Sequence, residues 1–192
     1  MKINIKPYPL MHPSTIVLVG TIVNGKPNFT TIGDVAVAGL NPPLLMISLN
    51  ENHNATKFVL EKGKMSVNYP GPDLMREVDF AGIYSSKTAD KSDLVESELV
   101  DGLPVVSKAS ITLLIKVIDK IQVKHRIVFV CDVYETLIDE SLMKDGKLDL
   151  SGVQPILYGP DNLYYSNISP IGTGYNEGKY LLHNDQEIKD DL

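Results

Sequence analysis

Two short polar clusters in the first third of the chain could contact a ligand. Asn28, Thr30 and Thr31 follow an Asn-Gly turn, and their amide, hydroxyl and backbone groups could meet the polar edge of a heterocycle. Residues 52–56 come directly before an expected helix, where free N–H groups and the helix dipole favour a phosphate. An ordinary hairpin with exposed threonines and simple helix capping explain the two clusters equally well, so neither is specific by itself.

A third polar segment, from Ser85 to Lys91, contains hydroxyl and ammonium groups that suit a phosphate but are equally typical of a solvated loop. The sequence contains no dinucleotide-binding glycine fingerprint, no Walker A motif, no Gly-x-Ser-x-Gly elbow and no His-Glu-x-x-His motif. Its four histidines are scattered, and its single cysteine, Cys131, lies in an apolar run where a packed thiol is expected. We therefore expect no metal site, and we assign no catalytic acid or base.

Composition limits the class of protein further. A chain of 192 residues that is 43% hydrophobic can bury one sizeable core, so we expect a single domain over residues 1–192 with a solvated acidic tail from about residue 184. The formal net charge of -6 argues against a general nucleic-acid binder. No apolar run approaches the roughly 18 residues that span a membrane, and no signal-peptide pattern is present. These features predict a cytoplasmic protein without nucleic-acid or membrane partners.

The elements that must position the polar clusters are mainly strands. Apolar and β-branched runs predict strands over 16–23, 27–32, 35–40, 44–49, 64–69, 104–107, 109–121, 124–136, 156–158 and 163–166. Short helices are expected over 56–62, 73–83 and 93–100. Many strands with antiparallel hairpin signals and few helices favour a closed or partly closed β-barrel over a βαβ sheet.

Local signals predict how these elements begin and end. Asn24-Gly25 predicts a two-residue hairpin turn, and the Asn-Pro-Pro triplet at 41–43 predicts a second turn. Asn54 is a plausible N-cap of the helix over 56–62, which Gly63 should end. The polar pair Asp119-Lys120 interrupts the longest apolar run, so we expect a bulge or bend there.

The order of these motifs resembles the flavin reductase-like family, and within it the flavoredoxin branch. The resemblance covers nearly the whole chain. The segments that carry it are Pro13-x-x-Ile-Val-Leu-Val-Gly-Thr, Gly25-Lys26-Pro27-Asn28-Phe29-Thr30-Thr31, Asn41-Pro42-Pro43, Asn54-x-Thr56, Gly63-x-x-x-Val67-Asn68, Ser85-Ser86-Lys87-Thr88-Ala89-Asp90-Lys91, His125 before an apolar strand, Pro155-Ile156-Leu157-Tyr158, Ile171-Gly172-x-Gly174 and the Gly178-Lys179 pair.

The resemblance implies an FMN-binding split β-barrel of the antiparallel, Greek-key type that works as a homodimer, with noncovalent FMN near the subunit boundary. It implies electron transfer from NADH or NADPH through FMN to a small-molecule substrate or a redox protein partner. The cofactor-binding residues that it implies are Asn28, Thr30 and Thr31 at the ring or ribityl chain, Asn54, Thr56 and Lys91 at the phosphate, and Asp34, His125 and Tyr158 near the flavin.

Asp34 departs from the family pattern, because flavoredoxins commonly place a tryptophan against the flavin at this position. An acid near the ring would disfavour the anionic reduced flavin electrostatically. Other classes of function therefore stay open. One is a non-catalytic barrel that binds flavin or another small ligand, and another is a barrel that has lost the cofactor and serves as an interaction module. A third is an electron carrier served by a protein partner.

Overall fold

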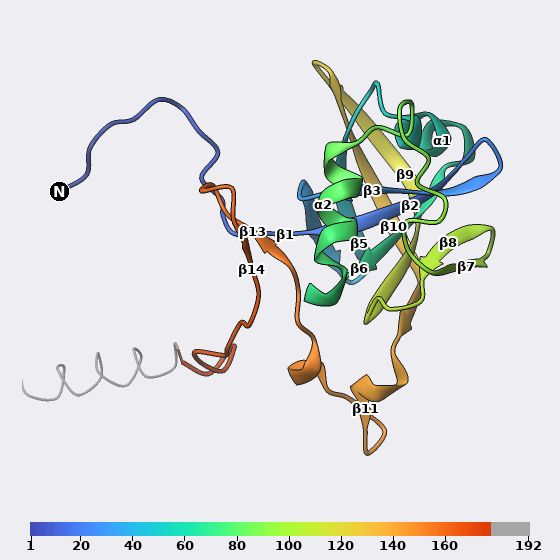
Figure 1. Ribbon diagram of the computed structural model, residues 1–192. Helices are drawn as coiled ribbons and strands as arrows, with labels where there is room; N and C mark the ends of the chain where they lie inside the picture. Colours follow the sequence, from blue (N-terminus) through green and yellow to red (C-terminus); the bar gives the residue numbers. More distant parts are fainter. Residues whose placement is uncertain (178–192) are drawn as a thin grey trace, which may run out of the picture.

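An antiparallel sheet of seven strands dominates the computed structural model, which describes residues 1–177 (Figure 1). Its strands are hydrogen-bonded in the order β3-β2-β6-β9-β10-β5-β4. Their bounds are β2 Val17–Val23, β3 Lys26–Ile32, β4 Val35–Leu40, β5 Pro43–Asn50, β6 Lys64–Tyr69, β9 Ile111–Val123 and β10 Arg126–Ile138. The prediction of a mainly β fold is confirmed.

The predicted hairpin turns also occur. Val23 pairs with Lys26 across Asn24-Gly25, and both turn residues have positive φ, as a tight hairpin of this kind requires. In the pairing of β9 with β10, Val130 faces Asp119 and Cys131 faces Val117. Ile118 is therefore the additional residue of a bulge, next to the Asp119-Lys120 pair where an irregularity was predicted.

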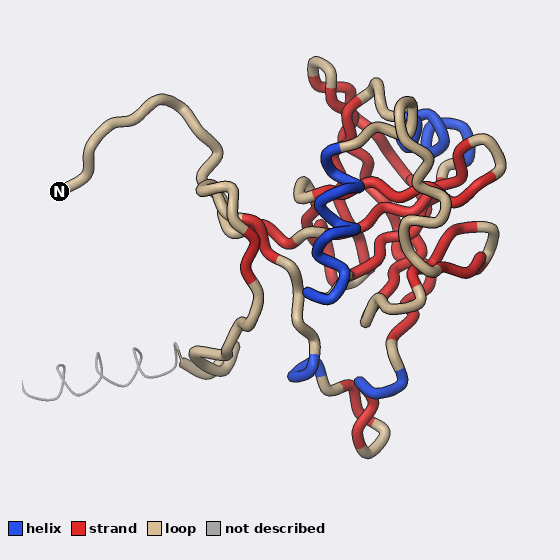
Figure 2. Tube along the Cα trace, in the orientation of Figure 1, coloured by secondary structure: helices blue, strands red, loops and turns tan. Residues whose placement is uncertain are grey.

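Two helices lie against the sheet (Figure 2). They are α1 Asn54–Lys62, which ends at Gly63, and α2 Met75–Ile83, preceded by the 3₁₀ turn η1 Pro72–Leu74. Asn54 is not the N-cap, contrary to the prediction. The capping position is His53, whose extended backbone precedes the first turn but whose side chain makes no capping hydrogen bond, and Asn54 is already helical.

The third predicted helix, over 93–100, is wrong. The chain forms β7 Ser97–Val100 there, which pairs with β8 Leu103–Val106 across Asp101-Gly102. Both turn residues have positive φ, so this is a second Asp/Asn-Gly hairpin and its pairing outweighs the helical pattern.

Small elements complete the described chain. They are β1 Ser14–Thr15, η2 Glu140–Leu142, β11 Met143–Lys144, β12 Lys147–Leu148, η3 Leu150–Gly152, β13 Leu157–Tyr158 and β14 Tyr164–Tyr165. The predicted pairing of the last two strands is confirmed, and β13 also pairs with β1.

The main core shows that the sheet curls. Buried side chains from β2, β3, β5, β6, β9 and β10 meet α1 in one cluster, so strands distant in the sheet order face a shared interior. Phe29 lies in a second cluster with Val78 and Ala81 of α2. This packing fixes α2 along β3 and thereby sets the wall of the pockets described below.

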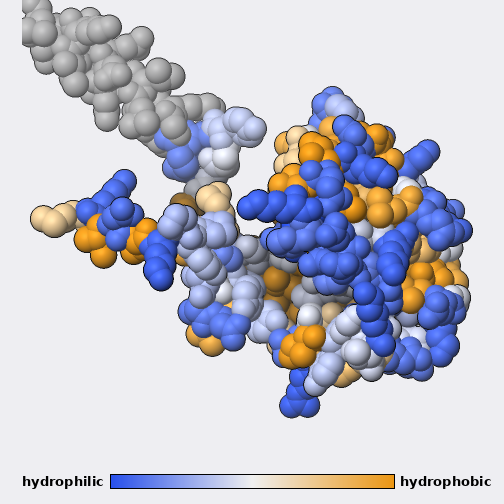
Figure 3. Space-filling view, turned by 90° about the horizontal axis from the view of Figure 1, so that it is seen from above, coloured by the Kyte–Doolittle hydropathy of each residue, from blue (hydrophilic) through white to orange (hydrophobic). Residues whose placement is uncertain are grey.

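Residues 1–13 project beside this body, whereas the chain after β10 returns to it at Ile156, which is buried in the second cluster (Figures 1 and 3). Ile3, Ile5 and Met11 are exposed in residues 1–13, as are Val37 and Leu40 on the edge strand β4. No helix among residues 1–177 is both long and apolar enough to cross a membrane. The predicted acidic tail from about residue 184 and the Gly178-Lys179 pair lie outside the described residues.

Candidate functional site

A small pocket forms where the start of α1 meets the end of α2. It has a volume of about 100 Å³ and lies among Thr30, the first residues of α1, the chain from Ala81 to Ser86, and Lys91. A larger pocket of about 380 Å³ adjoins it, shares Ser86 and Lys91 with it and contains Asn28. Four of the residues predicted to bind a cofactor therefore line two connected pockets.

Lys91 is the most unusual residue of this site. Its side chain is buried, with 4% of the residue exposed, and Nζ donates to the carbonyl oxygens of Ala81 at 3.3 Å and Tyr84 at 3.1 Å. It makes no ion pair with a carboxylate within residues 1–177. Because burial disfavours the charged ammonium, the pKa of Lys91 falls to about 8.

The helix start beside Lys91 also has free polar groups. His53 supplies no side-chain cap to α1, and its buried Nδ1 has no hydrogen-bond partner in the described part of the chain. Burial lowers the pKa of His53 most, and the nearby cations Lys91, Arg126 and Lys87 lower it further. The Asn54 amide donates to Ser86 Oγ at 3.0 Å, which links α1 to the loop of the pocket. Uncapped N–H groups beside the buried Lys91 ammonium suit an anion.

Asn28 supplies a second unpaired atom at the larger pocket. The residue is 3% exposed, and Nδ2 donates to Thr21 Oγ1 at 3.1 Å, whereas Oδ1 has no partner within residues 1–177. Buried polar atoms are rarely left without a partner unless a water or ligand satisfies them. Asn28 is therefore suited to accept a hydrogen bond from a ligand.

Thr31, Asp34 and Tyr158 lie in a different pocket of about 300 Å³, together with His12 and Tyr164. The Thr31 hydroxyl donates to the Val78 carbonyl of α2, and the ring of Tyr158 packs 5.1 Å from that of Tyr164. Thr30 and Thr31 point to opposite faces of β3, as successive strand residues must. The structure thus divides the predicted ring contacts between two surfaces.

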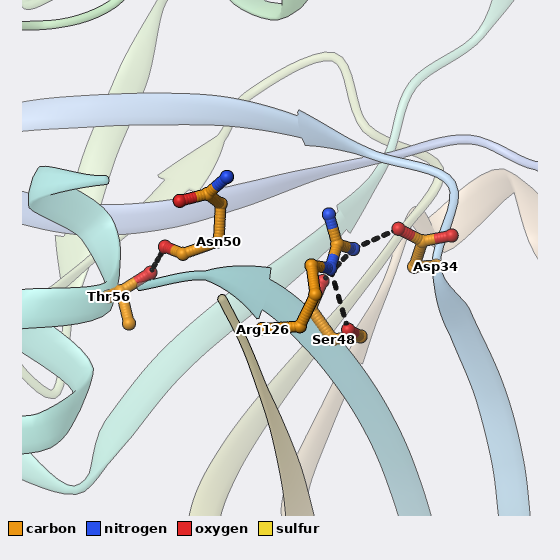
Figure 4. Close-up of polar contacts among 5 residues, drawn as sticks. All are labelled: Asp34, Ser48, Asn50, Thr56 and Arg126. Carbon is orange, nitrogen blue, oxygen red and sulfur yellow. Dashed lines mark hydrogen bonds and ion pairs between the residues drawn. The ribbon is translucent and has the colours of Figure 1, made fainter. Parts of the chain in front are cut away.

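The remaining predicted residues are not brought into these pockets. Thr56 is fully buried, and its hydroxyl donates to the Asn50 carbonyl at 2.6 Å, which fixes α1 to the end of β5 (Figure 4). His125 lies exposed in the turn between β9 and β10, where its carbonyl accepts a hydrogen bond from the Glu51 N–H at 3.1 Å. Their roles in ligand binding remain predictions.

Sequence reasoning missed two residues. Arg126 forms an ion pair with Asp34 (Figure 4). His53 lines the small pocket with Lys91, and its pKa is lowered by burial and then by the charges of Lys91 and Arg126. His53 lies inside the predicted polar cluster over residues 52–56, but as one of four scattered histidines it receives no role of its own from the sequence. Nothing local marks Arg126, because its partner lies 92 residues away.

These features define a β-barrel with polar pockets around the buried Lys91 ammonium, and the comparisons with known proteins agree on the fold. A family model described as a flavin reductase like domain matches residues 10–166. The chain belongs to the flavin reductase-like family, which makes it a flavin-related oxidoreductase with a split β-barrel fold.

Individual relatives extend this assignment. The flavoredoxin from Methanosarcina acetivorans shares 28% sequence identity at a TM-score of 0.88, over 94% of this chain and 99% of that chain. The flavoredoxin of Desulfovibrio vulgaris (Miyazaki F) shares 25% sequence identity at a TM-score of 0.84, over 93% of this chain and 100% of that chain. An FMN-binding protein from Thermus thermophilus is similar in fold alone. It shares 18% sequence identity at a TM-score of 0.74, over 88% of this chain and 97% of that chain. The comparison with curated proteins gives no match.

Proposed function

We propose that this chain is an FMN-dependent oxidoreductase that passes hydride or electrons from NADH or NADPH through noncovalent FMN to an acceptor. The observation that carries the proposal is the buried Lys91 ammonium, which has no carboxylate partner within residues 1–177 and lies in a pocket beside the uncapped start of α1. The phosphate of FMN supplies the missing negative charge, and the unpaired polar atoms at His53 and Asn28 fit a polar ligand.

The residues of the chain have separate tasks in this proposal. Lys91 and the N–H groups at the start of α1 would hold the phosphate, and Ser86 would border it. Asn28 would accept a hydrogen bond from the ligand at its Oδ1. When bound, FMN supplies the hydride-accepting chemistry, so the protein needs to orient it, tune its charge and control access.

An absorbance spectrum of the purified protein, repeated after FMN is added and the sample desalted, tests this function first. We expect retained flavin bands in the wild type, weaker retention in Lys91→Met, and unchanged retention in Lys116→Met, which removes an exposed lysine on β9. Anaerobic addition of NADH or NADPH should then bleach the retained flavin. A wild type that shows no affinity for FMN would refute the proposal.

The two flavoredoxin relatives support a second candidate, an electron carrier that a protein partner reduces. Slow bleaching by both nicotinamides together with fast reduction by a reduced redox protein would favour the carrier. FMN retention with neither reaction would favour a non-catalytic flavin-binding barrel.

We also propose a homodimer. The exposed apolar side chains on the edge strand β4, with Val37 61% and Leu40 83% exposed, support it. Sedimentation that shows only a 21.1 kDa species at micromolar concentration would contradict it.

A further inference from the structure

Arg126 is held in one position by two residues of neighbouring segments. It is the first residue of β10 and pairs with Asn50 of β5. Its side chain reaches Ser48, where Nε donates to Oγ at 3.0 Å and Nη2 donates to the carbonyl oxygen at 2.9 Å, and Nη2 also contacts the Asp34 carboxylate (Figure 4). Three contacts from two of its nitrogens fix the plane of the guanidinium.

Ser48 also fixes the acid of this pair. Its backbone N–H donates to the Asp34 carbonyl at 2.9 Å, so Asp34 and Arg126 are both attached to the same residue of β5. The remaining guanidinium nitrogen, Nη1, has no hydrogen bond within residues 1–177, and Figure 4 shows it pointing away from Asp34 and Ser48. A guanidinium carries five N–H donors, so Nη1 retains two for a ligand.

The position of this pair relates it to the pocket at Lys91. His53, at the start of α1, lies within electrostatic reach of both Lys91 and Arg126. Asp34 lines the pocket of about 300 Å³ and a further one of about 390 Å³, which share Ser14 and Gly33. The charges of Lys91 and Arg126 thus both act on His53, and Ser48, which holds Arg126, lines the pocket of about 390 Å³ together with Asp34. A ligand with its phosphate at Lys91 that also occupied this pocket would reach the pair of Arg126 and Asp34.

We propose that Arg126, held by Asp34 and Ser48, donates through Nη1 to the ring end of bound FMN and stabilises the negative charge that reduction places there. This inference rests on the proposed function. A hydride from NADH or NADPH brings two electrons and one proton to FMN and leaves the oxidised nicotinamide, so the flavin gains one negative charge. Arg126 attracts that charge and Asp34 repels it, so the pair sets the preference of the site for reduced over oxidised FMN.

The test is the reduction potential of FMN in the loaded protein, measured by equilibration with a reference dye. In Arg126→Gln we expect reduced FMN to bind about tenfold more weakly relative to oxidised FMN, which lowers the potential by about 30 mV for a two-electron couple. Asp34→Asn should shift the potential in the opposite direction. The double variant should return close to the wild-type value, because both opposing charges are then absent.

Two further variants separate this role from a structural one. Arg126→Lys keeps the charge but loses the planar group, so we expect it to recover part of the potential. Lys116→Gln removes an exposed cation that lines a separate pocket with Lys62 and Lys64, and it should leave the potential unchanged. A disturbed fold would not produce shifts of opposite sign in the Arg126 and Asp34 variants.

The outcomes also separate the inference from the proposed function. If the wild type and the variants retain FMN and all potentials agree, the role of Arg126 is refuted while FMN binding stands. If the wild type retains no FMN, the proposed function itself fails. Opposite shifts in the two single variants would support the inference.

Discussion

The affinity for FMN should fall as the pH rises through the pKa of Lys91. Burial lowers this pKa to about 8, and a bound phosphate, which is a dianion above pH 7, restores the charged form. About nine-tenths of the free protein carries the Lys91 charge at pH 7 and about one-tenth at pH 9, one unit on either side of the pKa. We therefore expect FMN to bind about tenfold more weakly at pH 9 than at pH 7.

Quenching of flavin fluorescence at pH 7, 8 and 9 would measure this change. Riboflavin, which lacks the phosphate, should show no matching decrease, and Lys91→Met should bind FMN weakly at every pH. Lys87→Met is the matched control, because Lys87 is exposed in the same loop and its loss should leave the pH dependence in place. A wild-type affinity that does not change between pH 7 and 9, or a riboflavin affinity that changes in parallel, would refute the reasoning.

The same pKa has a second consequence in the protein without flavin. Between pH 8 and 10.5 the unfolded lysine binds more protons than the folded one, so the free energy of unfolding rises with pH across this window. The difference of about 2.5 pKa units (10.5 − 8) predicts that the wild type gains about 2 kcal/mol relative to Lys91→Met between pH 7 and pH 10. Urea unfolding measures this gain, and a constant difference between the two proteins would show that burial does not disfavour the charge.

Two further predictions concern the barrel. Asn68→Ala should destabilise the protein by about 3 kcal/mol in urea unfolding, because it removes four buried hydrogen bonds. Gly20→Ala should cost about 2 kcal/mol and lower Tm, because its Cβ would lie 2.3 Å from Ser66 Oγ and 2.6 Å from the Pro104 carbonyl. Gly174→Ala, where no atom of residues 1–177 lies within 4 Å of the new Cβ, is the matched control. Equal stabilities for the two glycine variants would contradict the close approach at Gly20.

The strands were predictable because turn chemistry and apolar runs agreed over most of the chain. Asn24-Gly25 marked a hairpin turn because both residues have a positive φ, a conformation that only a few residue types tolerate. The prediction of a third helix over 93–100 is wrong for the converse reason. Its local pattern does not include the Asp101-Gly102 turn that follows, which is of the same kind as Asn24-Gly25 and commits Ser97–Val100 to a strand.

The turn between the two longest strands was placed too early. The prediction began the second strand at Lys124, but Lys124 has a positive φ of 53° and forms the turn with His125. A lysine is not a residue that signals this conformation, so the apolar alternation on both sides could not locate the turn. The error matters for the site, because the turn decides that Arg126 begins β10.

The polar loop that contains Lys91 was predictable from the sequence, but the burial of Lys91 was not. A lysine in a polar loop is expected in water, and the sequence predicts that the segment from Ser85 to Lys91 suits an anion. What buries the Lys91 ammonium is the end of α2, whose carbonyl groups at Ala81 and Tyr84 accept its hydrogen bonds. This docking depends on the packing of α2 against Phe29 and is therefore a property of the tertiary structure.

Asp34 shows how pairing between distant strands changes the electrostatic environment of a residue. Asp34 alone predicts a lone acid that would disfavour reduced flavin. The pairing of β5 with β10 places Arg126 beside Ser48, and the backbone bond from Ser48 to Asp34 places the acid against the guanidinium. The charge of Asp34 is thereby opposed at contact distance, so its net effect on a nearby anion depends on which of the two groups the ligand approaches. In the proposed site, Nη1 of Arg126, which has no hydrogen bond within residues 1–177, offers the favourable approach, so an acid at position 34 is compatible with a bound flavin.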